Sequence, residues 1–184
     1  MAPRPFRLNG GAQVEAGKLT EFLGEVPLFR GLTREQLERA LDAMEKQDMA
    51  PGEVIIREGE PGDVLYVLLE GTVEVSKTLL LRVARYDYNE REKTLSRMEG
   101  EDRAFFGEMA LFGGEPRSAT VTALTRCRLL TLDRRAFERL GEEDPEMGYK
   151  ILRNIVDVLC ERLRKANQDV LKLTTALSIA LRGP

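Results

Sequence analysis

Apolar residues between Thr33 and Met44 recur every three or four positions, which is the period of an amphipathic helix. Thr33 and Gln36 have the spacing of a capping box, in which each side chain bonds the backbone N–H of the other residue. We therefore expect a helix that begins after Thr33 and buries one stripe of side chains. The stripe consists of Leu37, Ala40, Leu41 and Met44.

The pattern changes between Pro51 and Asp133, where short runs of β-branched and aliphatic residues alternate with glycine-containing breaks. Many short strands with such turns predict a small antiparallel β-barrel or jelly roll, so the expected fold class is mainly β with flanking helices (α+β). The polar stretch 85–103 is expected to form a long hairpin tip or an exposed loop. The predicted strands cover residues 54–56, 64–69, 72–75, 79–83, 119–124 and 127–132.

Two helices are predicted after the strands. Asp133 can cap a short helix that ends at Gly141, and Asp144 with Pro145 can start a helix that continues to Leu181. The second helix would have about 36 residues and a length of about 54 Å at 1.5 Å per residue. A barrel of about 100 residues is only about 34 Å across, so the end of this helix is expected to project beyond the barrel.

Apolar residues of the long helix follow an unbroken heptad repeat. Valine or leucine at the a positions and leucine at most d positions favour a parallel two-stranded coiled coil, and hence a homodimer. A second apolar face, formed by Ile151, Ile155 and Val158, is expected to pack on the protein's own barrel. The heptad seam consists of Leu152, Val156, Leu159, Leu163, Ala166, Val170, Leu173, Leu177 and Ala180.

The composition narrows the chemistry that is open to this chain. Its 184 residues include no histidine, which is the commonest general base and metal ligand, so we expect neither an enzyme nor a metal site. Cys127 and Cys160 are predicted to be free thiols. The net charge of −3 does not favour nucleic acid as a partner, and no stretch has the pattern of a signal peptide or a membrane span. A cytoplasmic globular protein is therefore expected.

The segment FGEMALFGGEPRSATV, residues 106–121, has the features of a phosphate-binding turn. Gly107 allows close approach of the backbone, a short helical turn is expected to begin at Glu108, and Arg117 follows nine residues later. Backbone N–H groups and a guanidinium can bind phosphate oxygens, whereas a neighbouring carboxylate suits a hydroxyl donor. An anion and a hydroxyl on one small ligand indicate a ribose phosphate. Taken alone, the same pair also fits a helix-start carboxylate and an exposed loop cation.

This segment resembles the cyclic nucleotide-binding domain, which is shared by the bacterial catabolite activator protein, the regulatory subunit of the cyclic-AMP-dependent kinase and cyclic-nucleotide-gated channels. The resemblance covers about residues 27–160 and includes a second motif, IIREGEPGDVLYVLLEGTVEV, at residues 55–75. Gly59, Gly62 and Gly71 stand at the turn positions of that motif. The chain departs from the family by carrying extra residues just before Phe106.

The resemblance implies that Glu108 accepts a hydrogen bond from the ribose 2′-hydroxyl and that Arg117 pairs with the cyclic phosphate. N–H groups around Ser118 and Ala119 would complete the cradle. Ser118 does not decide whether the base is adenine or guanine. Cyclic AMP is favoured over cyclic GMP because the catabolite-activator group also has serine at this position. The start of the long helix would cover the base, with Arg162 in reach of it. The expected ligand-binding residues are Phe106, Gly107, Glu108, Met109, Ala110, Arg117, Ser118, Ala119, Val121 and Arg162.

The resulting hypothesis is a stand-alone cyclic nucleotide receptor, without a DNA-binding domain, that relays ligand binding through its C-terminal helix to an unknown partner protein. The alternative is a dimeric structural or adaptor module of the same fold that has lost nucleotide binding; an enzyme is the third candidate. The expected organisation is a flexible leader or short helix at 1–24, the nucleotide-binding barrel at 25–142, and a lid and dimerisation helix at 143–184.

Overall fold

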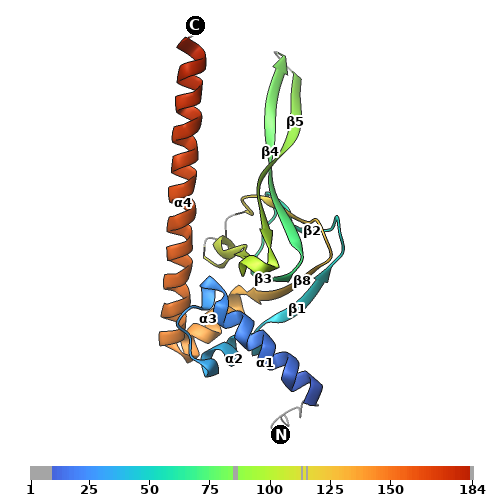
Figure 1. Ribbon diagram of the computed structural model, residues 1–184, viewed down its shortest axis with the longest axis vertical. Coiled ribbons are helices and arrows are strands. Elements are labelled where there is room, and N and C mark those ends of the chain that lie inside the picture. The colour runs from blue at the N-terminus through green and yellow to red at the C-terminus, as the bar shows by residue number, and fades with distance from the viewer. Residues whose placement is uncertain (1–9, 85–86, 113, 115, 183–184) are drawn as a thin grey trace.

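Two antiparallel sheets of four strands each form the centre of the structure (Figure 1). This computed structural model describes residues 10–84, 87–112, 114 and 116–182. The first sheet has the strand order β1-β8-β3-β6 and the second the order β2-β7-β4-β5, which confirms the predicted mainly β, antiparallel jelly-roll class. The strands are β1 Glu45–Met49, β2 Val54–Ile56, β3 Val64–Glu70, β4 Thr72–Ala84, β5 Asp87–Glu99, β6 Phe105–Phe106, β7 Thr120–Ala123 and β8 Cys127–Asp133.

Helices flank the sheets at both ends of the sequence. Of the predicted leader, residues 10–24 belong to a helix, while residues 1–9 lie outside the described part of the chain. The α-helices are α1 Gly10–Glu25, α2 Arg34–Asp42, α3 Arg134–Glu143 and α4 Pro145–Arg182. Short 3-10 helices are η1 Pro27–Phe29, η2 Gly100–Asp102 and η3 Glu108–Leu111.

The predicted helix starts are confirmed by side-chain caps. α2 has the full capping box, because the Gln36 side chain also accepts a bond from the Thr33 N–H. α3 ends two residues after the predicted Gly141, and α4 begins at the predicted proline. The capping bonds run from Gln36 N to Thr33 Oγ1, from Ala136 N to Asp133 Oδ1 and from Met147 N to Asp144 Oδ1.

Buried apolar side chains form two clusters among the described residues. The larger cluster lies between the first sheet and the helices, and the smaller one lies between the two sheets. In β8, Leu129 belongs to the smaller cluster and Leu130 to the larger one, because successive side chains of a strand point to opposite faces. The first sheet therefore connects the helices to the second sheet, which carries the long β4–β5 hairpin.

The strands differ from the predicted ones around this hairpin. Residues 72–75 and 79–83, predicted as two strands, belong to the single strand β4, and most of the polar stretch 85–103, predicted as a hairpin tip or loop, is its partner β5. The pairing extends from Thr72 opposite Glu99 to Ala84 opposite Asp87, so backbone bonds hold a polar segment in a strand. β1 and β6 are also strands that the apolar pattern does not indicate.

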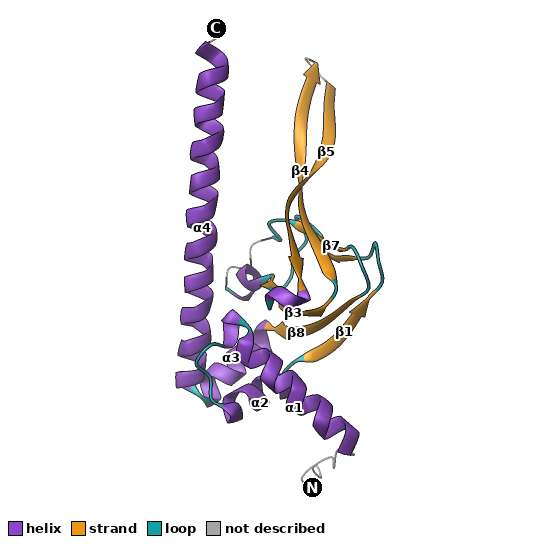
Figure 2. Cartoon of the chain, viewed as in Figure 1, coloured by secondary structure: helices purple, strands orange, loops and turns teal. Residues whose placement is uncertain are grey.

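α4 and the β4–β5 hairpin project from the same side of the molecule (Figure 2). The predicted inner face of α4 is confirmed, since Ile151 and Ile155 are each 1% exposed and Val158 packs against the larger cluster. By contrast, every residue from 160 to 181 is exposed. No helix in the described part of the chain has the length and apolar character needed to cross a membrane.

Candidate functional site

Arg117 lies between the start of β3 and the turn that precedes η3. Its Nη2 donates a hydrogen bond of 3.0 Å to the carbonyl of Val64, and its Nη1 donates one of 3.3 Å to the carbonyl of Gly107. The guanidinium carbon lies 6.0 Å from the centre of the Tyr66 ring. Arg117 forms no ion pair with any described residue, and its direct contacts are two carbonyl oxygens and an aromatic face.

Burial lowers the pKa of the Arg117 guanidinium, whereas the nearby groups Tyr66, Asp63 and Glu108 act in the opposite direction and raise it. Burial likewise raises the pKa of Tyr66, and the charge of Arg117 opposes that shift. Arginine remains protonated in proteins, so Arg117 is a partly desolvated cation. An anion placed beside it would restore the electrostatic stabilisation that water no longer supplies.

Two glycines make room for this guanidinium. A Cβ atom on Gly62 would lie 2.5 Å from Nε of Arg117, which is closer than van der Waals contact allows. Gly107 has a φ of +80°, and a Cβ there would approach the Val64 carbonyl oxygen to 2.9 Å. Glycine at position 62 is therefore needed for Arg117 to keep this position, and glycine at position 107 is favoured by both space and backbone conformation.

Glu108, the first residue of η3, connects the site to the long helix. Its side chain is almost fully buried, and one carboxylate oxygen accepts a bond of 2.7 Å from Nη1 of Arg162 in α4. Nη2 of Arg162 donates to the carbonyl of Phe105 at 2.9 Å, and its guanidinium carbon lies 5.5 Å from the centre of the Phe105 ring. The ion pair gives the buried carboxylate a partner of opposite charge and joins α4 to η3.

A pocket of about 210 Å³ lies beside this ion pair, between η1, the turn after η2 and α4. Arg30, Arg103, Asn154 and Arg162 are among its lining residues. The side chains of α4 and of the sheet therefore do not pack closely against each other beside this ion pair. The extra residues before Phe106 form η2 and the following Arg103, which pairs with Glu25 of α1.

A second arginine supports the site from the other helix. Nη2 of Arg134, at the start of α3, donates a bond of 2.6 Å to the carbonyl of Ala110 in η3. The backbone N–H of Arg134 donates to the carbonyl of Asp63 at 2.9 Å. Phe112 and Phe137 meet edge to face next to these bonds, with 5.8 Å between ring centres. The helical turn η3 is therefore attached to both α3 and α4.

The structure brings the predicted site residues of two segments, 106–110 and 117–119, around one cradle. Phe106 is buried and stacks on Tyr66 at 5.3 Å, while Met109 is exposed and its sulfur lies 4.0 Å from Oγ of Ser118. The N–H groups of Ser118 and Ala119 have no acceptor among the described residues. The remaining candidates, Ala110 and Val121, are buried, and Val121 lies in β7 within the smaller apolar cluster.

Three residues of this arrangement were not among the predicted site residues. Gly62 and Tyr66 lie in the second motif, about fifty residues before Arg117 in the sequence, and both contact or approach Arg117 in the structure. Placing the second motif beside the first could have identified them. Arg134 follows the helix cap Asp133 and has no local signal of a role in the site. Its contact with Ala110 depends on how α3 packs.

Comparison with known proteins identifies the family of this chain. The family model "Cyclic nucleotide-binding domain" matches residues 46–144, more than half of the chain. A cAMP-dependent protein kinase regulatory subunit of Hypocrea atroviridis is 39% identical over 119 residues, which are 65% of this chain and 22% of that protein. The chain thus spans about a fifth of that relative.

Solved structures are similar over most of the chain. A cyclic nucleotide-binding domain from Methylobacillus flagellatus superposes with a TM-score of 0.71 at 25% identity, covering 87% of this chain and 84% of that one. The regulatory domain of Toxoplasma gondii PKA, crystallised with cAMP, has a TM-score of 0.64 at 26% identity and covers 84% of this chain and 52% of that one. By its match to the family model and by its fold, this chain belongs to the cyclic nucleotide-binding domain family.

Proposed function

We propose that this protein is a receptor for a cyclic nucleotide, with cyclic AMP favoured over cyclic GMP. The observation that carries the proposal is Arg117, a partly buried cation with no ion-pair partner among the described residues, beside the buried carboxylate of Glu108. A cation and a carboxylate held this close suit a ligand that presents an anion and a hydroxyl together. A ribose cyclic phosphate is such a ligand.

In the proposed complex Arg117 pairs with the phosphate, and the free N–H groups of Ser118 and Ala119 donate to its oxygens. The ribose 2′-hydroxyl donates to the carboxylate oxygen of Glu108 that Arg162 does not occupy. Ser118, whose side chain is exposed beside Met109 at the edge of the cradle, does not decide the base, and the preference for adenine follows the catabolite-activator group, which also has serine there. The cAMP-bound relative among the similar structures supports the same choice.

Ligand binding is proposed to pass to α4 through the pair of Glu108 and Arg162. Since Glu108 would bond both the ribose and Arg162, a ligand that moves η3 also changes the contact that holds α4. We also propose Arg162 as a residue of the ligand site, because it bonds Glu108 and would lie at the edge of the base. Only a ligand with different affinities for the two helix positions can shift α4 between them.

The proposed output is a contact with another protein, in a homodimer joined along the heptad seam. Beyond Leu159 the seam residues are exposed, with Leu163, Val170 and Leu173 between 61% and 65% exposed, so the described chain itself does not cover them. The regulatory role of the relatives supports a function in signalling rather than in catalysis. We propose the three parts 1–24, 25–142 and 143–184 as leader, ligand domain, and lid and dimerisation helix.

Calorimetric titration with cyclic AMP, cyclic GMP and 5′-AMP tests the receptor proposal. We expect saturable binding of the cyclic nucleotides without turnover, and Arg117→Ala to weaken it by about 3 kcal/mol, or about a hundredfold, because a charge-assisted contact to a desolvated phosphate is lost. Arg97→Ala is the matched control, because Arg97 pairs with Glu74 on the outer hairpin.

The alternative, a dimeric module of the same fold that has lost nucleotide binding, predicts no heat with any of the three nucleotides. Equal affinities of the wild type and Arg117→Ala would show that the nucleotide binds elsewhere. Either result would remove the proposed site, and product formation from a cyclic nucleotide would make the protein an enzyme.

A further inference from the structure

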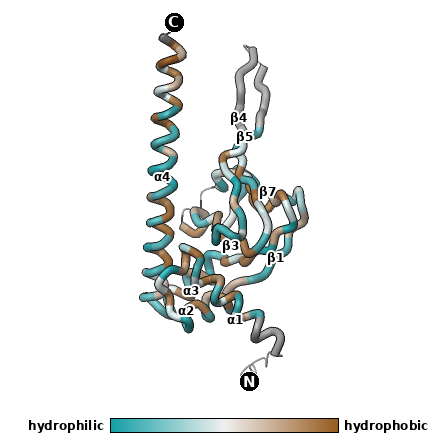
Figure 3. Tube along the Cα trace, viewed as in Figure 1, coloured by the Kyte–Doolittle hydropathy of each residue, from teal (hydrophilic) through white to brown (hydrophobic). Residues whose placement is uncertain are grey.

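The last three turns of α4, residues 170–181, have an unusual surface for a helix end (Figure 3). They contain one charged residue, Lys172, and large aliphatic residues on several sides. Leu171, Ile179 and Leu181 are 68%, 69% and 78% exposed. A helix that is apolar on most of its sides is normally buried. At about 18 Å, these turns are too short for the roughly 30 Å hydrocarbon core of a membrane.

These turns carry two stripes of residues, and the heptad seam accounts for only one of them. The second stripe is here called the flank stripe. Each of its residues comes one position after one of the seam residues Val170, Leu173, Leu177 and Ala180 in the sequence. One position is a rotation of about 100° around the helix, so a helix paired along the seam leaves the flank stripe uncovered. The flank stripe consists of Leu171, Thr174, Ser178 and Leu181.

The flank stripe is complementary to itself in the antiparallel direction. Its large residues, Leu171 and Leu181, stand at the two ends, and the small hydroxyl residues Thr174 and Ser178 stand between them. When two copies are aligned antiparallel, large residues meet large ones and small residues meet small ones. Thr174 already donates a bond of 2.8 Å to the carbonyl of Val170, so burying its hydroxyl leaves no donor without a partner.

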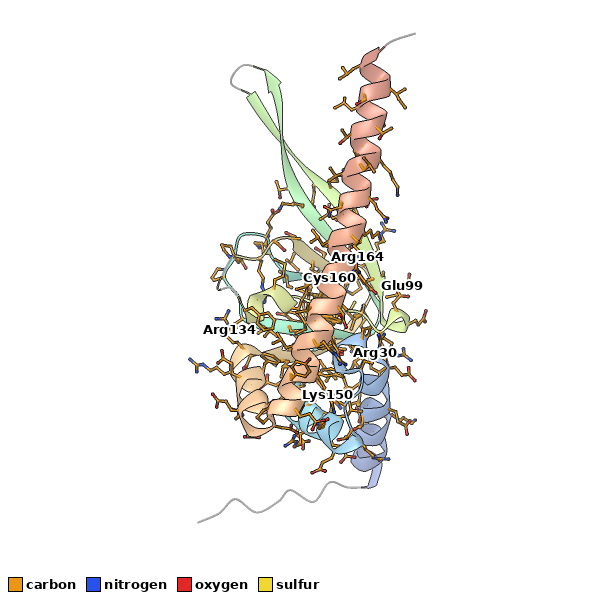
Figure 4. All side chains as sticks on the ribbon, turned by 90° about the vertical axis from the view of Figure 1, so that its left-hand side faces the viewer. Arg30, Glu99, Arg134, Lys150, Cys160 and Arg164 are labelled. Atoms are coloured by element: carbon orange, nitrogen blue, oxygen red, sulfur yellow. The ribbon has the colours of Figure 1, made fainter. Side chains whose placement is uncertain are left out.

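The angle between the stripes fits one kind of assembly. A helix in a four-helix bundle has two neighbours at nearly right angles around its axis, and the two stripes are separated by about 100°. The flank positions one and two turns earlier hold Arg164 and Asn167, so an apolar contact along this face begins only at Leu171. In Figure 4 this part of α4 lies at the level of the outer end of the β4–β5 hairpin and apart from it, and its residues are exposed.

We propose that two coiled-coil dimers associate through their helix ends, with the flank stripe of each helix packed antiparallel on the flank stripe of another copy. The product is a tetramer with the ligand domains at its two ends. Leu171 packs on Leu181 of the partner subunit, and Thr174 packs on Ser178 of the partner subunit. Such a contact is isologous and closes on itself, as is usual for tetramers built from two dimers. The inference rests on the seam dimer proposed above.

Sedimentation equilibrium of the full chain tests the assembly. We expect the wild type at four times the chain mass of 20.7 kDa and the double variant Leu171→Glu/Leu181→Glu at twice that mass. Ile179→Glu is the matched control, because Ile179 is equally exposed in the same turns but lies outside both stripes, and it should remain a tetramer.

A wild type at twice the chain mass would overturn the tetramer while leaving the seam dimer intact, whereas a monomer would remove both. Co-sedimentation of the wild type with phosphatidylserine vesicles, lost in Leu171→Glu/Leu181→Glu, would assign the flank stripe to a lipid surface instead. The direction is tested in a Cys160→Ser background by mixing Thr174→Cys and Ser178→Cys chains. Oxidation should link the two kinds of chain to each other, and absence of this mixed disulfide would overturn the antiparallel alignment.

Discussion

At the scale of single residues, the position of Arg117 depends on the absence of a side chain at Gly62. A Cβ on Gly62 would come within 2.5 Å of Nε, 2.6 Å of Nη2 and 2.8 Å of Cζ of Arg117. These atoms are the end of a flexible side chain, so the guanidinium can move away while the backbone stays in place. A substitution here should therefore affect the ligand site and leave the fold intact.

We expect Gly62→Ala to lower affinity for cyclic nucleotide at least tenfold with little change in melting temperature. The added methyl group displaces the guanidinium from the carbonyls of Val64 and Gly107. Calorimetric titration and thermal unfolding measure the two effects. In the double variant Gly62→Ala/Arg117→Ala the losses should not add, because both changes remove the same contact. Full additivity would mean that Gly62 acts on something other than Arg117.

A second prediction at this scale concerns Arg162, which bonds both Glu108 and Phe105. We expect Arg162→Gln to bind cyclic nucleotide more weakly and to lose the ligand-induced protection of residues 145–165 in hydrogen exchange. The reason is that this side chain carries the bond between Glu108 and α4. Arg164→Gln, two positions along on the exposed side of the helix, is the control and should behave as the wild type. If Arg162→Gln retains full protection, the relay does not use this pair.

At the scale of elements, α3 and α4 approach most closely at two glycines. A Cβ on Gly148 would lie 2.8 Å from Cα of Gly141, whereas a Cβ on Gly141 would lie 3.8 Å from Cα of Gly148. The first distance is a clash with backbone, which cannot move away like a side chain, and the second is ordinary contact. The packing of the two helices that hold η3 thus depends on one of the two glycines.

Gly148→Ala should destabilise the protein by about 1–3 kcal/mol, because an extra methyl group forces two packed helices apart. Gly141→Ala provides the comparison: it fits the available space, and alanine favours the helix over glycine by up to about 1 kcal/mol. Urea unfolding of the two variants gives both free energies of unfolding. Equal stabilities of Gly148→Ala and Gly141→Ala would contradict the close approach of α3 and α4.

At the scale of the whole molecule, α4 is far longer than its own domain requires. Its first turns are buried by Ile151 and Ile155, but all residues from 160 to 181 are exposed. An exposed stripe with an unbroken heptad repeat is typical of a coiled coil whose second helix comes from another chain. The proposed oligomer would cover this apolar surface of α4.

The double variant Leu163→Lys/Leu173→Lys should be a monomer of 20.7 kDa in sedimentation experiments, because two charges at seam positions cannot be buried between helices. Both side chains are more than 60% exposed in the single chain, so its own folding should be unaffected. Gln168→Lys, on the opposite side of the helix, should keep the mass of the wild type. A double variant that keeps the full mass of the wild-type assembly would exclude the heptad seam as an interface.

The sequence by itself determined those features that depend on local spacing. Local patterns identified α2, α3, α4 and most strands, whereas the segment of α1 was expected as a flexible leader or a short helix. The caps at Thr33, Asp133 and Asp144 marked where helices begin, because capping bonds join residues three positions apart. The motif at 106–121 and the glycines of the second motif identified the family, since the residue types that bind a phosphate occur close together in the chain.

Only the tertiary structure decided the features that join distant segments. β1 and β5 are polar strands that backbone hydrogen bonds hold against β8 and β4. The pattern of apolar residues cannot predict strands that are held in this way. The pair of Glu108 and Arg162 joins residues 54 positions apart, and it forms because packing of Ile151 and Ile155 directs α4 past η3. The sequence predicted that Arg162 lies near the base of a ligand. In the folded chain its guanidinium donates hydrogen bonds to Glu108 and to the carbonyl of Phe105, because the contacts of the first turns of a long helix set the path of the rest.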